Sequence, residues 1–176
     1  MLHRYGPQEW WPADSPFEMM IGAILTQNTA WTNVERAIEN LKVLDCLDAG
    51  RILRLELGDL AESLRPSGYF NIKAKRLRNY CQWYLDQGGF NLLSTWDDTS
   101  LRQGLLSVNG IGPETADDIM LYAFERPLFV VDAYTKRLFS RLGVMEGDLG
   151  YAHVQALFHQ ELRRDVALFN EYHALL

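Results

Sequence analysis

Two glycines lie between apolar segments in the stretch Leu105-Leu106-Ser107-Val108-Asn109-Gly110-Ile111-Gly112-Pro113-Glu114-Thr115-Ala116. Gly110 can adopt a positive φ, and Gly112 lets the backbone approach another group closely. Pro113 suits the first position of the following helix, because that position needs no amide proton. Ile111 is expected to turn inward and hold the two helices together. The stretch therefore predicts two helices joined by a tight hairpin.

The backbone of this hairpin offers a place for an anion. Amide N–H groups that are exposed before a helix attract anions, and a DNA phosphate is a natural occupant. Such a site needs little positive side-chain charge. This matters because the chain has a formal net charge of −6, which argues against non-specific coating of nucleic acid. A Gly-x-Gly pair alone is more often only a tight turn, so its surroundings decide its meaning.

Helical periodicity extends through nearly the whole chain. Ser15-Pro16-Phe17-Glu18 predicts a capped helix start, and the run up to Leu25 is apolar on almost all sides, as in a buried central helix. The short apolar piece 129–131 cannot nucleate a sheet. The fold class is therefore all-α. Further helices are expected over 34–41, 49–57, 60–64, 71–87, 99–107, 114–124 and 132–142, and in two segments from 151 to the end.

Composition sets the remaining bounds. The 176 residues, 48% of them apolar and 23% charged, suit one large globular domain or two small ones. No run approaches the about eighteen apolar residues of a membrane span. The N-terminus lacks a signal-peptide core, so we expect a cytoplasmic, nucleoid-associated monomer. Cys46 and Cys81 match no paired metal-ligand spacing and are interpreted as reduced, packed thiols.

Basic residues gather in two places. Residues 65–85 contain five of them and no acidic residue, and a second group lies at 136–141. Either group alone is typical of a solvated helix face, but two groups on either side of the hairpin favour a localised phosphate-binding surface. Lys73, Lys75 and Arg76 are the predicted DNA contacts, together with Gly110, Ile111 and Gly112.

The stretch 106–116 resembles the helix-hairpin-helix element of the endonuclease III superfamily of DNA glycosylases. In that family a Val-Asp pair opens a later helix, as Val131-Asp132 does here at a similar distance, and residues 24–29 are similar to the family's buried helix and its polar end. The resemblance covers about residues 15–145. We expect a six-helix lobe over 15–126 that contains the hairpin. A second helical lobe would comprise 1–14 and 127–176, with the active cleft between the two.

Asp132 is the predicted catalytic residue. On the residues alone it is typical of a helix N-cap, and the two roles are compatible. Glycosidic cleavage passes through an oxocarbenium-like transition state that a fixed carboxylate stabilises, and the same group can orient or deprotonate water. The resemblance implies double-stranded DNA with a damaged, flipped base as substrate. It also implies that Gln27 fills the gap the base leaves, although Gln27 and Asn28 equally well end the buried helix.

Bifunctional members of the family carry a nucleophilic lysine two residues after the second hairpin glycine. Glu114 stands at that position, where a solvent-exposed first-turn glutamate is the simplest interpretation, and no other lysine is expected nearby. The prediction is a monofunctional glycosylase that uses water and leaves an abasic site. The alternatives are a bifunctional glycosylase and abasic-site lyase, disfavoured by Glu114, and a non-catalytic helix-hairpin-helix DNA-binding module, disfavoured by Asp132.

The aromatic residues suggest the base. The segments 10–12, 27–31 and 65–77 are similar to the 3-methyladenine DNA glycosylase III type, which lacks the lysine and sandwiches a methylated purine between aromatics. Alkylated purines are cationic and bind electron-rich ring faces. They also leave readily, so no strong general acid is required. Trp11 and Trp31 are expected to flank the base with Trp10 supporting, although single aromatics before helices more often only pack.

Many family members carry a four-cysteine [4Fe–4S] loop after the last helix. No metal or cofactor is expected in this chain. The apolar ending at 172–176 suggests that the C-terminus is incomplete, in which case a cluster would follow Leu176.

Overall fold

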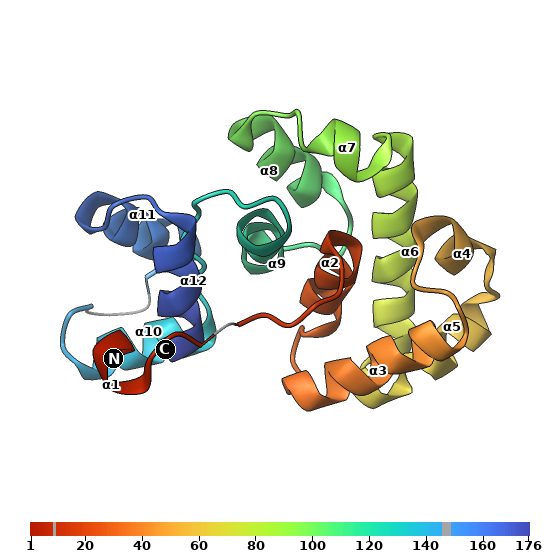
Figure 1. Cartoon of the computed structure of the whole chain (residues 1–176), viewed down its shortest axis with the longest axis horizontal. Coiled ribbons are helices and arrows are strands. Elements are labelled where there is room, and N and C mark those ends of the chain that lie inside the picture. Colours follow the sequence, from red (N-terminus) through yellow and green to blue (C-terminus); the bar gives the residue numbers. More distant parts are fainter. Residues whose placement is uncertain (9, 146–148) are drawn as a thin grey trace.

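The computed structural model describes residues 1–8, 10–145 and 149–176. Within these ranges every regular element is a helix or helical turn, which confirms the all-α prediction (Figure 1). No helix in the described ranges is long and apolar enough to cross a membrane. In chain order the elements are α1 (Leu2–Tyr5), α2 (Pro16–Leu25), α3 (Trp31–Val43), α4 (Ala49–Arg54), α5 (Leu57–Ser63), the 3₁₀ turn η1 (Arg65–Ser67), α6 (Phe70–Asp86), α7 (Gly89–Leu93), α8 (Asp98–Ser107), α9 (Pro113–Asp118), the π-helical turn η2 (Ile119–Ala123), α10 (Ala133–Arg141), α11 (Tyr151–Glu161) and α12 (Val166–Leu175).

Helix α2 is the buried central helix that the sequence predicts. Ser15 is extended, and its hydroxyl accepts a hydrogen bond from the Glu18 amide at 3.1 Å, while Pro16 takes the first helical position. The Glu18 carboxylate accepts from the Asp14 amide at 3.3 Å, one residue earlier than in a standard capping box. Every residue from 18 to 25 is buried, because α3, α6, α9 and η2 all contact this helix.

Two helical features differ from the sequence expectation. The glycines after α6 end that helix, with Gly88 at φ 83° and Gly89 at φ 74°, but the short helix α7 begins at Gly89 itself. The helix expected over 114–124 consists of α9 followed by the π-helical turn η2. In such a turn the backbone hydrogen bonds span five residues instead of four, and these turns are frequent at functional sites.

The buried apolar side chains form two separate clusters. The larger one draws on α2 to α9, and the smaller one on Phe129–Val131, α11 and α12, with Leu121 of η2. We divide the molecule on this basis into a first lobe and a second lobe, and we propose a boundary near residue 126. The first lobe holds eight α-helices, whereas six were expected. Three of the eight, α4, α5 and α7, are short.

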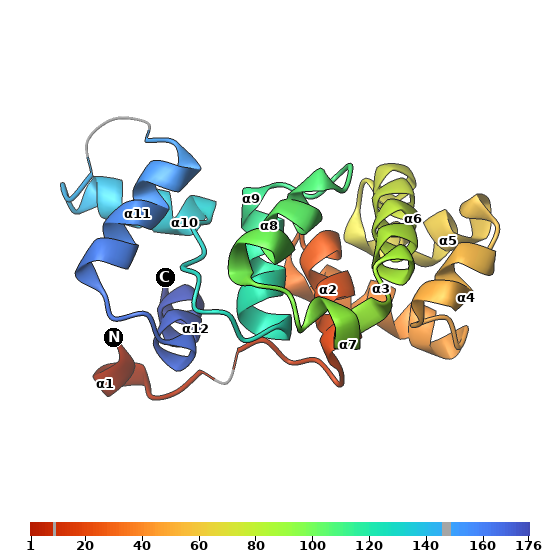
Figure 2. The same ribbon diagram turned by 90° about the horizontal axis from the view of Figure 1, so that it is seen from above.

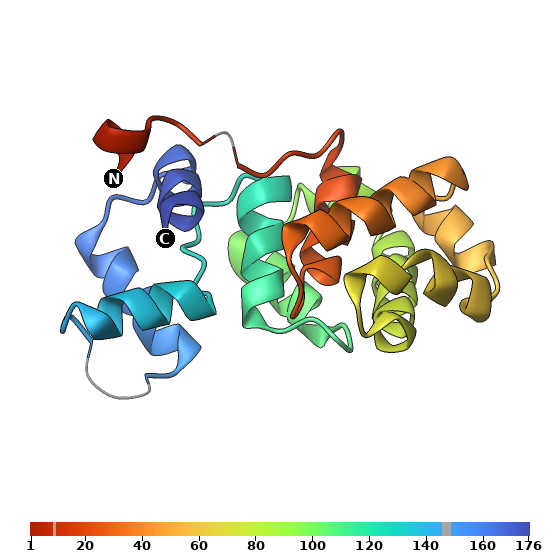
Figure 3. The ribbon, with the colours of Figure 1, turned by 90° about the horizontal axis from the view of Figure 1, so that it is seen from below.

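The second lobe contains both ends of the chain. In the N-terminal segment, residues 6–8 lie beside α12, and residues 10–15 lie beside the first lobe, where α2 begins (Figures 2 and 3). The backbone amide of Gln8 donates to both carboxylate oxygens of Glu171 at 3.2 Å. Trp11 then packs against the first core. The segment therefore contacts both lobes just before the first central helix.

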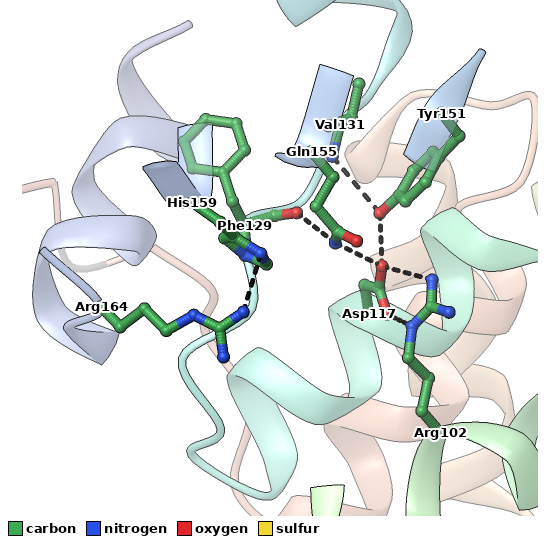
Figure 4. A network of polar contacts seen from close by, with 8 residues as sticks. All are labelled: Arg102, Asp117, Phe129, Val131, Tyr151, Gln155, His159 and Arg164. Atoms are coloured by element: carbon green, nitrogen blue, oxygen red, sulfur yellow. Dashed lines mark hydrogen bonds and ion pairs between the residues drawn. The ribbon is translucent and has the colours of Figure 1, made fainter. Parts of the chain in front are cut away.

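A buried aspartate, Asp117, links the two lobes at a second place (Figure 4). Asp117 in α9 is fully buried and pairs with Arg102 of α8 at 2.7 Å. It also accepts hydrogen bonds from Tyr151 (2.8 Å) and Gln155 (2.7 Å) of α11. The Tyr151 hydroxyl in turn accepts from the Val131 amide at 3.4 Å. The network thus holds the residue that precedes Asp132.

Candidate active site

The hairpin has the geometry that its glycines predict. Gly110 has φ 103°, and a Cβ there would collide with the Arg76 side chain. Ile111 is buried in the first core, and its amide donates to the Val108 carbonyl at 3.1 Å. At Gly112, by contrast, a Cβ would meet no atom within 4 Å. The backbone at Gly112 therefore faces open space, as an approaching phosphate requires.

The hairpin lines a cleft of about 540 Å³. On its wall the Gln27 side chain donates to the Gly110 carbonyl and to the Thr115 hydroxyl, each at 3.0 Å. Arg76 donates to the Gln27 side-chain oxygen. Gln27 is therefore held against the hairpin in this structure, and it would have to release these bonds to enter a DNA duplex. The lining residues are Gln27, Asn28, Arg76, Gly110 to Thr115 and Tyr151.

The structure contradicts the prediction that Lys73 contacts DNA. The residue is 1% exposed, and its ammonium group donates to the carbonyls of Leu25 (2.7 Å) and Ser67 (2.6 Å). Burial and the nearby Arg76 lower the pKa of Lys73 to about 8. Lys73 therefore stabilises the end of α2 and cannot reach a phosphate. Lys75 is exposed on the same helix and remains a predicted contact.

Asp132 is the N-cap of α10 at the start of the second lobe. One carboxylate oxygen, Oδ1, accepts hydrogen bonds from the Thr135 amide and from the Thr135 hydroxyl, each at 2.7 Å. Among the described residues the second oxygen, Oδ2, accepts no hydrogen bond. The residue is half-buried. Asp132 is thus a fixed carboxylate with one oxygen available.

Glu114 lies in the first turn of α9 and is exposed as a residue, in line with the sequence interpretation. Partial burial of its carboxyl group raises its pKa, and the negative charge of Asp132 raises it further. Lys136 lowers the same pKa, so this lysine lies near the site. Lys136 follows Asp132 by one turn of α10, and the expectation that no other lysine replaces the missing nucleophile stays a prediction.

A stripe of three residues extends the site beyond what the sequence indicated. Glu114, Asp118 and Tyr122 follow one another at intervals of four along α9 and η2, and residues so spaced share a helix face. The Tyr122 hydroxyl and His173 Nδ1 of α12 are 2.8 Å apart, and the same nitrogen lies 3.9 Å from Asp118 Oδ1. We call Glu114, Asp118 and Tyr122 the acidic stripe. The spacing was visible in the sequence, but the residues it faces were not.

The three tryptophans that the sequence predicts to line the base pocket lie in mutual contact. Trp11 contacts Trp31 edge to face, with ring centroids 5.1 Å apart at 84°, and it contacts Tyr122 at 5.1 Å. Trp10 lies 5.8 Å from Trp31 and is 37% exposed. Because Trp11 and Trp31 touch and are nearly perpendicular, no base fits between their faces in this arrangement. Flanking a base would require the two rings to separate.

The two cysteines do not suit an iron–sulfur cluster. Cys81 is buried in the first core, and burial raises its pKa to about 12, whereas cluster ligands bind as thiolates. In the described part of the chain no three His, Cys, Asp or Glu side chains are grouped to hold a metal ion. The absence of a cofactor from this chain remains a prediction.

Known proteins resemble the chain in sequence and in structure. The family described as HhH-GPD superfamily base excision DNA repair protein matches residues 21–164. A protein of Methanocaldococcus jannaschii, named provisionally as a DNA repair glycosylase, is 49% identical over 179 residues, which cover 100% of this chain and 81% of that protein. Endonuclease III of Sulfolobus acidocaldarius is 26% identical over 161 residues, which cover 91% of this chain and 70% of the enzyme.

Two solved structures share the fold. The Helicobacter pylori 3-methyladenine DNA glycosylase bound to 1,N6-ethenoadenine superposes with a TM-score of 0.80 at 32% identity, over 98% of this chain and 88% of that one. An endonuclease III–DNA complex also gives a TM-score of 0.80, at 20% identity, over 93% of this chain and 74% of that one. At that identity the second likeness concerns the fold alone.

Proposed function

Since the chain belongs to the HhH-GPD superfamily of base excision DNA repair proteins, we propose that this DNA glycosylase is monofunctional and releases alkylated purines such as 3-methyladenine from double-stranded DNA. The observation that carries this proposal is that Glu114, which lines the cleft, lies close enough to Asp132 for the Asp132 charge to raise the pKa of Glu114. A fixed carboxylate is present, and the position of the family's nucleophilic amine holds a second acid. Such a site favours hydrolysis with water as the nucleophile.

The hairpin and Asp132 divide the work of the reaction. The amides around Gly110 and Gly112 bind a phosphate next to the lesion, and the damaged nucleotide leaves the stack because its glycosidic carbon is otherwise inaccessible. Asp132 then stabilises the positive charge that develops on the sugar. Its free oxygen Oδ2 orients the attacking water. Gln27 and Asn28 lie on the cleft wall, where one of them can fill the gap in the duplex.

The choice of base rests on the tryptophan cluster and on a likeness. Trp10, Trp11 and Trp31 offer electron-rich rings to a cationic purine. The Helicobacter pylori 3-methyladenine glycosylase is 32% identical to this chain, which supports the same class of lesion here. Alkylated purines need no strong general acid to leave. An acid-rich but lysine-poor site suits them better than it suits neutral, stable bases.

A panel of single-lesion duplexes tests this proposal. We expect release of 3-methyladenine or 7-methylguanine, and little release of uracil or 8-oxoguanine, in single-turnover assays with excess enzyme. Asp132→Asn should reduce release by about 10²-fold or more and leave DNA binding intact. Release of only neutral bases would contradict the proposed lesion class. Full activity of Asp132→Asn would remove Asp132 from the reaction.

Borohydride trapping on the same duplexes tests the hydrolytic mechanism. A lysine nucleophile forms a Schiff base that borohydride reduces to a stable protein–DNA adduct, whereas water forms none. We expect no adduct with wild-type protein. An efficient adduct that disappears in Lys136→Gln would instead identify Lys136 as a nucleophile and would make the enzyme bifunctional.

A further inference from the structure

Two buried polar side-chain atoms without partners lie on either side of Tyr122. Among the described residues, Trp11 Nε1 and Asp118 Oδ1 are both buried and make no hydrogen bond. The Trp11 ring contacts the Tyr122 ring, and Asp118 precedes Tyr122 by four residues. Leaving a buried donor or acceptor unpaired costs free energy. Such a group persists in a folded protein where a ligand supplies its partner.

The two atoms belong to the place where an extruded base would lie. Asp118 is the middle residue of the acidic stripe, between Glu114 beside Asp132 and Tyr122 beside the tryptophans. It is 6% exposed as a residue. Helix α12 faces it with His173, and the N-terminal segment brings Trp11 to the same wall. Once the Trp11 and Trp31 rings separate, as a flanked base requires, a base against Tyr122 and Trp11 would lie beside both residues that carry the unpaired atoms.

The charges around Asp118 are predominantly negative. Burial raises the pKa of Asp118 well above its ordinary value, and Glu114, Asp117 and Asp132 raise it further. Burial lowers the pKa of the facing His173, and the negative charge of Asp132 opposes this with a smaller effect. Asp117 is already paired with Arg102, and Lys136 acts on Glu114. A cation bound beside Asp118 offsets this burial and repulsion and favours the ionised carboxylate, whereas a neutral base does neither.

We propose that Asp118 determines base specificity: its carboxyl group accepts a hydrogen bond from the exocyclic amino group of the extruded purine and, with Trp11, selects cationic bases over neutral ones. The inference rests on the proposed function, because it assumes that a base enters this pocket. Asp118 contacts only the base. Asp132 stabilises the charge on the sugar and orients the water.

Binding of small purines tests this role without requiring catalysis. The probes are 3,9-dimethyladeninium, a permanent cation, and 9-methyladenine, its neutral counterpart, with tryptophan fluorescence as the readout. We expect wild-type protein to bind the cation about tenfold or more tightly than the neutral purine. Asp118→Asn should bring the two affinities within about threefold of each other. Asp59→Asn, the same change at an exposed position on α5, should retain the wild-type ratio.

Each outcome has a distinct meaning. Equal binding of both purines by wild type, or an unchanged ratio in Asp118→Asn, overturns the role of Asp118 even if alkylated bases are released from DNA. Selective binding of the cation by a protein that releases no alkylated base leaves the inference standing and overturns the proposed function. Should Asp118→Asn fail to fold, Trp11→Phe provides the second variant, and it should lower the ratio of cation to neutral binding, because a phenyl ring attracts a cation less strongly than an indole ring; an unchanged ratio overturns the selection.

Discussion

At the scale of single residues, the site places two aspartates in opposite environments. Asp132 caps a helix and has two hydrogen bonds to one oxygen. Asp118 is buried and its Oδ1 atom has no hydrogen-bond partner, so it destabilises the folded protein when no ligand is bound. Functional sites often retain such unfavourable groups, and their removal tends to raise stability. Asp118 should therefore affect stability and specificity in opposite directions.

The stability of Asp118→Asn should depend less on pH than that of wild type. The folded-state pKa of Asp118 is raised above the ordinary value of 3.8. Between pH 3.8 and this folded-state pKa, the native state therefore binds more protons than the unfolded state. Wild-type stability therefore falls as pH rises through this interval, by about 1.4 kcal/mol for each unit of the raise. Asp118→Asn removes this loss and should be the more stable protein at pH 7.

Urea unfolding at several pH values measures this difference. Glu114 keeps its own raised pKa in the variant, so a smaller slope of the same sign should remain. Asp59→Asn should follow the wild-type curve. Parallel curves for wild type and Asp118→Asn would show that the buried carboxyl is already satisfied in solution.

At the scale of elements, α6 shows that a basic helix has two faces with different duties. Lys75 is exposed, whereas Lys73 donates to two carbonyls in the interior. Lys73→Met should lower the free energy of unfolding by about 1–3 kcal/mol, since two buried carbonyls lose their donor, and should leave the DNA affinity of the folded protein unchanged. Lys75→Gln should leave the free energy of unfolding unchanged and weaken DNA binding. It should also reduce the slope of log affinity against log salt by about one.

Thermal unfolding and DNA titrations at several salt concentrations separate the two effects. A Lys73→Met protein of normal stability would mean that the ammonium group is not needed at the end of α2. An unchanged salt slope in Lys75→Gln would place the phosphate backbone elsewhere on the surface.

The elements that the sequence predicts correctly are those with local causes. Ser15 caps its helix and Gly110 adopts its positive φ because each needs only its near neighbours. Lys73 was misjudged because the direction of a long side chain depends on the packing of α6 against α2. Asp118 and Tyr122 were missed because their significance arises from α12 and the N-terminal segment, which are remote in sequence. The π-helical turn η2 has no signal that periodicity could reveal.

At the scale of the whole molecule, the two lobes meet through Asp117. Tyr151→Phe removes one hydrogen bond to this buried carboxylate and the acceptor of the Val131 amide. We expect a loss of about 1.5–3 kcal/mol in the free energy of unfolding. The rate of base release should also fall, because Asp132 follows directly on the loosened Val131.

Urea unfolding and single-turnover kinetics of the same preparation test both effects. Tyr5→Phe is the matched control, since its hydroxyl lies on an exposed ring of α1. Equal rates for Tyr151→Phe and wild type would mean that the first helix turn of α10 alone positions Asp132.

The path of the N-terminal segment has a consequence for the order of events during synthesis. Residue 8 leaves the ribosome well before residue 171, yet the two are hydrogen-bonded in the folded protein. The first lobe has all its core residues by the time residue 128 is made and can fold as a unit while translation continues. The wall that carries Trp11 and His173 must wait for α12. In a nascent chain the hairpin can thus reach its final form well before the base pocket is complete.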